Sequence, residues 1–405
     1  MAKIDDSVKN KVPELRFKGF TDEWEQRKLG DEVRIVMGQS PNSENYTDDP
    51  NDYILVQGNA DMKNGRVLPR VWTTQVTKQA EKDDLILSVR APVGDIGKTA
   101  YDVVIGRGVA AIKGNEFIFQ NLGKMKSDGY WTRYSTGSTF ESINSTDIKE
   151  AIISVPAIEE QDKIGSFFKQ LDDTIALHQR KLDLLKEQKK GYLQKMFPKN
   201  GAKVPELRFA GFADDWEERK LSDVANHRGG TAIEKYFDKD GVYKVISIGS
   251  YGLNSQYVDQ NIRAISNEIT DGRVVNSGEL TMVLNDKTAN GTIIGRSLLV
   301  EKDNEYVINQ RTEIISPKEN FDSNFAYTIL NGPFREKVKR IVQGGTQIYV
   351  NYPAVSNLNL ELPKIEEQKK IGSFFKQLDD TIALHQHKLD LLKEQKKGFL
   401  QKMLV

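Results

Sequence analysis

The sequence predicts an α+β protein in which two mixed α/β domains are each followed by a long helix. A 33-residue segment occurs twice with two differences, both copies space apolar residues in heptads, and the segments before them contain short β-type runs. The predicted order is an N-terminal segment and first domain at 1–157, a helix at 158–197, a linker and second domain at 198–364, and a second helix at 365–405.

The duplication is close in some segments and faint in others. The sequence IGSFFKQLDDTIALHQRKLDLLKEQKKGYLQKM begins at Ile164 and returns at Ile371, while VPELRFKGFTDEWEQRKL begins at Val12 and returns as VPELRFAGFADDWEERKL at Val204. The domains between them share only traces of similarity. We interpret them as one fold that carries two different surfaces. Drift after an old duplication is the alternative, but it would need recombination between the copies to keep the helices nearly identical.

Each long repeat predicts one strand of a coiled coil, because its apolar residues alternate at spacings of four and three. Polar residues interrupt this seam at His178 and Lys189, and we expect His178 and its counterpart His385 to set register rather than to bind metal. The predicted seam residues are Ile164, Phe168, Leu171, Ile175, Leu182 and Leu185 in the first copy and Ile371, Phe375, Leu378, Ile382, Leu389 and Leu392 in the second.

The simplest interpretation is that the two helices pair with each other, in a parallel or an antiparallel sense. The alternative is that each helix packs on its own domain, but a strict seam is narrower than the apolar face of most globular-domain helices. About 35 helical residues span roughly 50 Å. The pair is therefore expected to act as a rigid spacer.

Short β-type runs separated by Gly, Asn and Asp predict mixed α/β domains. Strands are expected at 53–56, 85–89, 103–105, 151–155, 243–248, 280–284, 292–299 and 313–315, and a helix near 324–342. The Asn351-Tyr352-Pro353-Ala354 sequence is expected to form a turn at a strand edge. Polar, glycine-rich segments predict loops at 37–41, 135–140, 227–231 and 343–349.

Such loops let backbone approach a polyanion and offer polar donors, although ordinary surface turns have the same composition. Residue type and predicted loop position select ten candidate base or phosphate contacts: Gln39, Ser40, Arg90, Arg107, Thr139, Arg228, Asn285, Lys287, Arg311 and Gln347.

Composition excludes several classes of protein. The 405 residues contain no cysteine, which excludes disulfides, cysteine zinc sites and thiol catalysis, and their formal net charge of zero disfavours an indiscriminate polyanion binder. The start of the sequence lacks the apolar stretch of a signal peptide, and no run reaches the ~20 apolar residues of a membrane span. A cytoplasmic protein is expected.

We find no catalytic or metal-binding motif in the sequence. Gly97-Lys98-Thr99 lacks the preceding glycine of a P-loop, because Pro92 stands there. The Asn351-Tyr352-Pro353 sequence departs from the Asn/Asp-Pro-Pro-aromatic motif of amino-methyltransferases. Three of the four histidines lie in the helix repeats. We therefore expect no catalytic residue, no metal and no cofactor in this chain.

Taken together, the repeated segments make the chain resemble, over its full length, the DNA-specificity subunit of type I restriction-modification enzymes. The resemblance rests on the duplicated VPELRF openings with their Trp-Glu-x-Arg-Lys-Leu ends and on the glycine-rich segments before each helix. It rests also on Pro-x-Ile-Glu-Glu-Gln at 156–161 and 363–368, and on the Phe-Phe…Leu-Asp…Leu-Leu-Lys helices.

The resemblance implies two target recognition domains, each reading one half of a bipartite DNA sequence, and an antiparallel, intramolecular coiled coil between them. It implies double-stranded DNA, two methyltransferase subunits and ATP-driven restriction subunits as partners. S-adenosylmethionine, ATP and Mg would then be carried by those partners. A pseudo-twofold axis perpendicular to the DNA would present equivalent faces to two adenines on opposite strands.

A different class of function remains open on sequence grounds. The chain could be a coiled-coil scaffold whose two domains bind proteins, and a net charge of zero is compatible with that. Duplex binding that ignored sequence would favour the scaffold.

Overall fold

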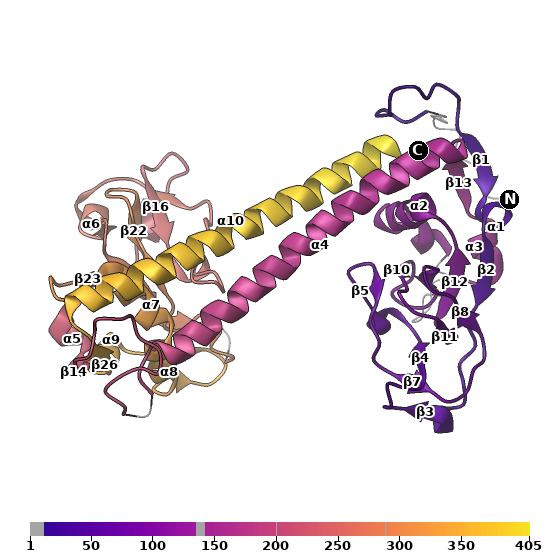
Figure 1. Cartoon of the computed structure of the whole chain (residues 1–405). Helices are drawn as coiled ribbons and strands as arrows, with labels where there is room; N and C mark the ends of the chain where they lie inside the picture. The colour runs from indigo at the N-terminus through magenta and orange to yellow at the C-terminus, as the bar shows by residue number, and fades with distance from the viewer. Residues whose placement is uncertain (1–11, 135–141, 200, 288) are drawn as a thin grey trace. The chain divides into compact units, whose positions relative to one another are not determined.

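The computed structural model describes residues 12–134, 142–199, 201–287 and 289–405 (Figure 1). Two compact units are present, one made of residues 1–179 with 387–405 and the other of residues 180–386. The division runs through the two long helices, α4 (Ile158–Lys195) and α10 (Ile365–Met403), so each unit holds a stretch of both helices.

The first unit contains two larger sheets and one short strand pair among its described residues. The pair joins β1 (Glu25–Lys28) to β13 (Ile152–Val155). One sheet has the order β2 (Arg34–Met37), β12 (Val109–Lys113), β9 (Leu85–Ser88), β10 (Ile96–Lys98), β6 (Arg66–Val67) and β5 (Met62–Lys63). The other has the order β3 (Tyr46–Thr47), β7 (Trp72–Thr73), β4 (Tyr53–Val56), β11 (Val103–Ile105) and β8 (Gln79–Ala80).

The helices of the first unit cover the β2–β12–β9 side of its core. They are α1 (Leu29–Glu32), α2 (Glu116–Ser127), α3 (Ser145–Lys149), the first part of α4 and the last part of α10. Phe117 of α2 and Phe168 of α4 lie in one buried cluster with Leu85, Leu87 and Ile112 of the sheet. Because α2 and α4 share this core with the sheet, the first helix repeat is built into its domain.

The second unit repeats this plan with additions. Its pair joins β14 (Glu217–Lys220) to β26 (Asn359–Leu362). One sheet has the order β15 (Ala225–Gly229), β23 (Thr312–Pro317), β19 (Leu280–Val283) and β21 (Ser297–Leu299). A second has the order β17 (Arg263–Ala264), β16 (Tyr243–Ile246), β22 (Tyr306–Ile308) and β18 (Val274–Val275). A third, small sheet has the order β20 (Asn285–Asp286), β25 (Ile348–Tyr349) and β24 (Gln343–Gly344). Its helices besides α4 and α10 are α5 (Leu221–Val224), α6 (Glu268–Asp271), α7 (Ser323–Asn331), α8 (Pro333–Lys339) and α9 (Tyr352–Ser356).

Matching backbone hydrogen bonds show that the two domains share one fold. The Val89 amide donates to Gly108 O at 2.9 Å, and the Leu284 amide donates to Arg311 O at 3.0 Å. In turn, Val89 O accepts from the Ile143 amide at 3.0 Å, and Leu284 O accepts from the Val350 amide at 2.9 Å. The end of β9 in the first domain therefore corresponds to the end of β19 in the second.

The two long helices are antiparallel. In the first unit, Asp172 of α4 accepts two hydrogen bonds from Lys396 Nζ of α10, at 2.6 and 2.9 Å. In the second unit, Lys189 of α4 donates to Asp379 of α10 at 2.5 Å. The beginning of α4 thus pairs with the end of α10 and the reverse, so the implied antiparallel pair is confirmed and the parallel alternative is excluded.

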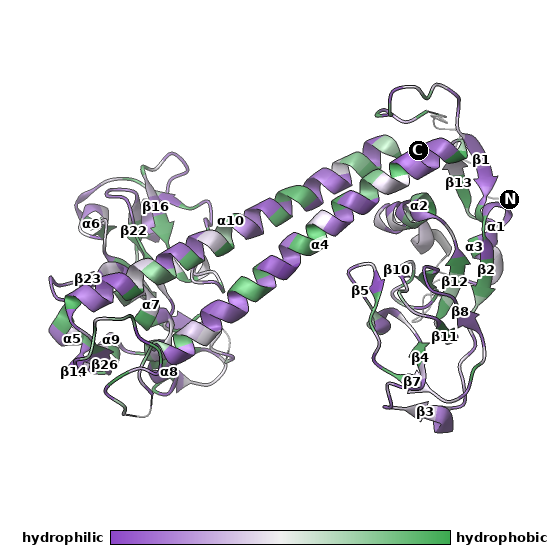
Figure 2. Cartoon of the chain, viewed as in Figure 1, coloured by the Kyte–Doolittle hydropathy of each residue, from purple (hydrophilic) through white to green (hydrophobic). Residues whose placement is uncertain are grey.

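Hydrophobic residues recur along both helices in Figure 2, and the predicted seam is turned away from solvent. Seven of its residues are buried, namely Ile164, Phe168, Leu182, Leu185, Ile371, Phe375 and Leu389. The other five are partly buried, namely Leu171, Ile175, Leu378, Ile382 and Leu392. The ends of the seam also enter the domain cores, because Phe168 and Phe375 belong to the core clusters of their units.

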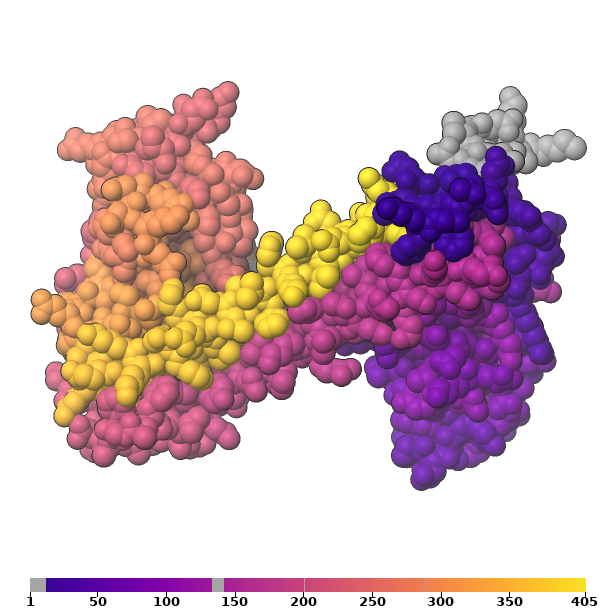
Figure 3. Space-filling model, turned by 45° about the horizontal axis from the view of Figure 1, so that its top comes forward, coloured from indigo at the N-terminus to yellow at the C-terminus, as the bar shows by residue number. Residues whose placement is uncertain are grey.

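The repeated opening segments close over the ends of the helices. In the first unit the Leu15 amide donates to Lys402 O at 2.9 Å, so the N-terminal segment lies against α10 (Figure 3). In the second unit the Leu207 amide donates to Lys195 O of α4 at 2.8 Å. The VPELRF sequence therefore performs the same packing role in both units.

Each helix also allows a second helix to approach closely through a glycine. A Cβ on Gly165 would lie 3.1 Å from the Phe117 amide nitrogen at the start of α2, and a Cβ on Gly372 would lie 2.6 Å from the Phe325 amide nitrogen at the start of α7. Close packing at this position requires the glycine, which explains why both helix repeats carry one.

Several local predictions are wrong, including the loop expected at 343–349, where β24 and β25 pair with each other. The helix expected near 324–342 is two helices, α7 and α8, because Gly332 and Pro333 interrupt it and a proline cannot continue a helix. The strand expected at 292–299 is present only as β21, since a turn with Gly295 at φ 70° occupies its first part. Residues 352–356 form helix α9 and not a strand-edge turn.

Candidate nucleic-acid interface

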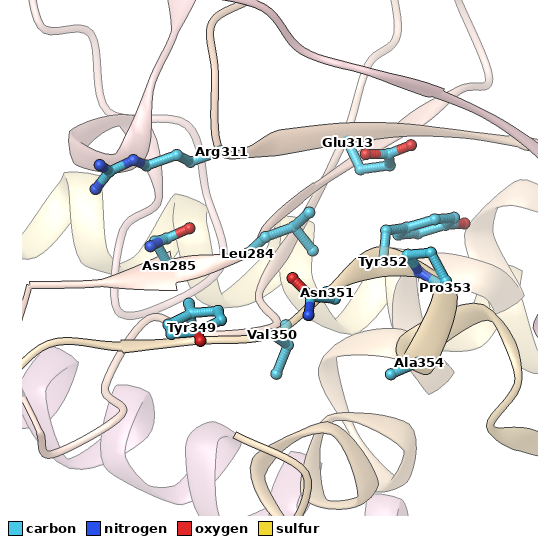
Figure 4. A pocket seen from close by; sticks show the side chains of 10 residues that line it. All are labelled: Leu284, Asn285, Arg311, Glu313, Tyr349, Val350, Asn351, Tyr352, Pro353 and Ala354. Atoms are coloured by element: carbon cyan, nitrogen blue, oxygen red, sulfur yellow. The ribbon is translucent and has the colours of Figure 1, made fainter. Parts of the chain in front are cut away.

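Each domain has a recess at the end of its central strand. The recess of the first domain has a volume of about 660 Å³ and is lined by Ser40, Pro41, Asn42, Ser43, Tyr46, Gln57, Gly58, Asn59, Ser88, Arg90, Ala91, Arg107 and Gly108. The recess of the second domain has a volume of about 680 Å³ and is lined by Leu284, Asn285, Arg311, Glu313, Tyr349, Val350, Asn351, Tyr352, Pro353 and Ala354 (Figure 4). We call these the first recess and the second recess.

The first recess is positively charged. Among its described lining residues are two arginines and no Asp or Glu, and both Arg90 and Arg107 are exposed. The Arg107 amide donates to Ser40 Oγ at 3.2 Å, which joins the loop after β11 to the loop after β2. Guanidinium groups with exposed donors suit both phosphates and the edge of guanine.

The second recess is more apolar and has two chemically different ends. In Figure 4 Arg311 and Asn285 lie at one end, and Glu313 and Tyr352 lie at the other. Arg311 has a φ of 65°, a left-handed conformation that costs a side chain other than glycine about 1–2 kcal/mol. A left-handed, exposed arginine at a recess is compatible with a functional role for that residue.

The acidic end of the second recess is a hydrogen-bonded cluster. The Glu313 carboxylate lies 2.6 Å from His227 Nδ1, and the His227 ring stacks on Tyr352 with centroids 4.5 Å apart. Burial raises the pKa of Glu313, and the hydrogen bond and the charge of His227 oppose that rise. The effect of burial is the larger one, so the pKa of Glu313 lies above its ordinary value.

Asn351 presents its amide to the second recess because it does not cap the helix that follows it. Its counterpart Asn144 accepts hydrogen bonds from Thr146 N and Asp147 N at the start of α3. At the start of α9 the corresponding position is Pro353, which has no N–H, and the Asn351 side chain makes no capping bond. The amide therefore remains available within the recess.

The structure brings five of the predicted contact residues together in two groups. Ser40, Arg90 and Arg107 line the first recess. Asn285 and Arg311 line the second.

The other predicted contacts that the structure describes line neither the first nor the second recess. Gln39, Lys287 and Gln347 are exposed, and Thr139 lies outside the described residues.

Arg228 does not lie in a loop, which corrects the expectation for 227–231. Residues up to Gly229 belong to strand β15 and pair with β23. The Arg228 guanidinium donates to both Glu279 oxygens at 2.7 and 2.9 Å and to Val274 O at 3.2 Å. Its donors are used within the fold, so we do not retain it as a DNA contact.

The glycines of the two predicted loops serve the fold rather than the approach of a ligand. A Cβ on Gly38 would lie 2.1 Å from Gly106 O, and a Cβ on Gly230 would lie 2.0 Å from Asn309 O. Both contacts are with backbone, which cannot yield. These glycines are required where two backbone segments meet behind each recess.

Sequence reasoning missed several lining residues. Tyr349, Asn351 and Tyr352 follow one another closely in the sequence, but the pattern at 351–354 predicted a strand-edge turn and no contact residue. Gln57 and Asn59 in the first recess follow strand β4 without a recognisable motif. The position of Asn351 before a proline at the second residue of a helix is a signal that could have identified it.

The described part of the chain lacks two features that other classes of protein have. No group of three or more His, Asp or Glu side chains is placed to hold a metal ion. No helix combines the length and the apolar character that crossing a bilayer requires.

Comparisons with known proteins point to one family. A family model described as the type I restriction modification DNA specificity domain matches the chain twice, at residues 21–187 and 213–394. The chain is 32% identical over 177 residues to a putative type I restriction enzyme MjaX specificity subunit of Methanocaldococcus jannaschii, covering 42% of this chain and 41% of that protein. It is 22% identical over 406 residues to the MjaVIII specificity subunit of the same organism, covering 95% and 92%.

Solved structures share the fold. A crystal structure of a type I restriction-modification S subunit from M. genitalium matches with a TM-score of 0.69 at 13% identity, covering 97% of this chain and 99% of that one. A chain from a structure on complex assembly and conformational transition of the type I system matches with a TM-score of 0.50 at 16% identity, covering 94% and 97%.

Proposed function

The chain belongs to the type I restriction-modification DNA specificity family, and we propose that it reads a bipartite, gapped DNA sequence on behalf of partner enzymes. In this proposal each domain recognises one half of the target. Two methyltransferase subunits then methylate one adenine in each half, and restriction subunits use ATP and Mg to act on unmethylated DNA.

One observation carries the proposal. The two domains share the order of their central strands and matching backbone hydrogen bonds, yet at a corresponding position the first recess carries Arg90 and the second carries Asn285. A shared framework with different polar side chains at one site suits two readers of different sequences.

The paired helices support a role as spacer. They are continuous, their ends are built into the domain cores, and matched ion pairs hold them antiparallel. A stiff connection of this kind would fix the number of unread base pairs between the two halves of a target.

The duplicated helices also support the binding of two copies of one partner. Leu177 and Leu384 occupy the same position in the repeats and are 63% and 65% exposed. Equivalent surfaces bind equivalent partners, so we place the methyltransferase contacts on the helices. S-adenosylmethionine would be bound by those subunits, and this chain would contribute no catalytic residue of its own. The complex would act in the cytoplasm, where its DNA is.

The decisive experiment is methylome sequencing of a host that expresses this chain with its methyltransferase. We expect one new gapped adenine motif, and replacement of residues 30–155 by another recognition domain should change only one half of it. Absence of any new motif, or duplex binding that ignores sequence with and without the methyltransferase, would instead support a scaffold whose domains bind proteins.

A further inference from the structure

Arg90 and Asn285 occupy one structural position in two copies of the fold. The residue before each of them is Val89 or Leu284. Its amide donates to the carbonyl of the residue just before β12 or β23, and its own carbonyl accepts from an amide of the segment that leads into α3 or α9. Arg90 and Asn285 then leave the central strand at the same point. Each lines the recess of its own domain.

Neither side chain is used by the described part of the fold. Within the described residues, no hydrogen bond or ion pair engages the Arg90 guanidinium or the Asn285 amide, although the backbone of both is paired, with Ser142 and Tyr349 respectively. This distinguishes them from Arg228, whose guanidinium is bonded to Glu279. A polar side chain that leaves a fixed backbone position and keeps its donors unused is available to a ligand.

The two residue types match two different bases. In the major groove an arginine forms two hydrogen bonds with guanine O6 and N7, and an asparagine forms two with adenine N6 and N7. Arginines flank the position in both domains, Arg107 in the first recess and Arg311 in the second. Those flanking groups suit phosphate contacts, which fix the orientation of the duplex without selecting a sequence.

We propose that this shared position determines specificity in each domain, with Arg90 selecting a guanine in one half of the target and Asn285 selecting an adenine in the other. The inference rests on the proposed function, since it names the residues that perform the reading. It predicts that each substitution alters one base position in one half-site and leaves the other half unchanged.

The test uses the full chain with its methyltransferase and reads the methylated motif of each variant by methylome sequencing. We expect Arg90→Ala to lower the preference for guanine at one position by roughly 10- to 100-fold, and Asn285→Ala to do the same for an adenine in the other half. Arg90→Lys and Asn285→Gln keep the required donors, and each should retain part of the preference that the alanine variant loses.

The chain offers a matched pair of controls. Arg34 and Asn226 are exposed residues of the same two types at equivalent positions of β2 and β15, where Arg34 pairs with Lys113 and Asn226 with Ser316, and neither lines a recess. Arg34→Ala and Asn226→Ala are expected to leave the motif unchanged. Thermal unfolding of every variant identifies any that fails to fold.

The outcomes separate the two proposals. If the unmodified chain directs no gapped motif, the proposed function is wrong. If the unmodified chain directs a gapped motif but the folded alanine variants keep the same motif, the position contacts no base. If the alanine variants lose methylation evenly at all sites, the position contacts only the DNA backbone. Either result would overturn this inference and leave the proposed function intact.

Discussion

Arg16 and Glu160 are 144 residues apart in the sequence and form a two-pronged ion pair, with Nε–Oε1 and Nη2–Oε2 distances of 2.7 Å. Arg208 and Glu367 repeat it at 2.7 and 2.8 Å in the second unit. Each pair fastens a VPELRF segment to the start of a long helix. The glutamates are almost inaccessible, with side chains 1% exposed, so each depends on its arginine.

Removal of one of these glutamate charges should weaken one unit and not the other. We expect Glu160→Gln to lower the free energy of unfolding of the first unit by about 2–3 kcal/mol, because Arg16 loses a buried partner. Hydrogen exchange should show faster opening of β1, β13 and the start of α4. Glu367→Gln should affect the second unit in the same way, and the exposed Glu159→Gln should change neither. Equal loss in both units would contradict this account.

The Lys189–Asp379 pair predicts a charge reversal experiment on the helices. Its side chains are 27% and 25% exposed, so the attraction is modest. We expect Lys189→Asp or Asp379→Lys alone to cost about 0.5–1 kcal/mol, and the two together to restore most of it. Chemical denaturation measures all three. Lys190→Asp, at an exposed neighbouring position, is the control. If the double variant does not recover the free energy of unfolding lost in the single variants, the ion pair does not stabilise the pairing of the helices.

The second unit should carry a pH-dependent contribution from Glu313. Because burial raises the pKa of Glu313, the folded state binds the proton more tightly than the unfolded state. Protonated Glu313 therefore contributes to the free energy of unfolding below its ordinary pKa of 4.5. That contribution is lost as pH rises through the folded pKa. The Glu313→Gln variant cannot titrate at this position and does not lose that stability. The difference between its melting temperature and that of the natural chain should therefore grow in favour of the variant from pH 4 to pH 7.

A His227→Ala variant provides the control for this prediction. The hydrogen bond and charge of His227 lower the pKa of Glu313, so its removal should move the loss of stability to higher pH. A difference between Glu313→Gln and the natural chain that is the same at every pH would show that Glu313 does not titrate in this range.

The spacer role predicts a change in gap length. Insertion of seven residues into both helices, near their midpoints, preserves the heptad seam and adds about 10 Å. At ~3.4 Å per base pair the methylated motif should gain about three unread base pairs. Methylome sequencing reads this directly. An insertion of seven residues in each helix that left the gap unchanged would argue against a spacer role.

The exposed leucines predict a graded loss of partner subunits. Leu177→Asp should remove one of two methyltransferase subunits, and the double variant with Leu384→Asp should remove both, as measured by native mass spectrometry. Exposed Glu159→Gln serves as a control for general effects of helix substitution. Retention of two subunits by the double variant would place the docking surface elsewhere.

The sequence was most informative where periodicity is strict. A seam such as Phe168–Leu171–Ile175 specifies a helix and its buried face by itself, because alternate spacings of four and three fit only one structure. The direction of pairing was not specified by the seam. It depends on contacts such as Asp172 with Lys396, which join residues 224 positions apart.

The candidate site was only partly predictable, because residue type and loop propensity are local while a recess is assembled from distant segments. Arg90 and Arg107 were identified by type, but their shared recess is formed by strands that are not adjacent in the sequence. Arg228 was misassigned because glycine after it suggested a loop, whereas pairing with β23 made it part of a strand. Asn351 was missed because its amide is available only through the loss of a helix-capping hydrogen bond, which Pro353 prevents.

The contact between Leu15 and Lys402 has a consequence for the order of folding during synthesis. The second unit is one continuous stretch, 180–386, whereas the first unit also requires residues 387–405. A ribosome delivers the chain from its N-terminus at about 5–20 residues per second. The domain that is translated first is therefore the one completed last, and its helix core stays open until the final turns of α10 emerge from the exit tunnel.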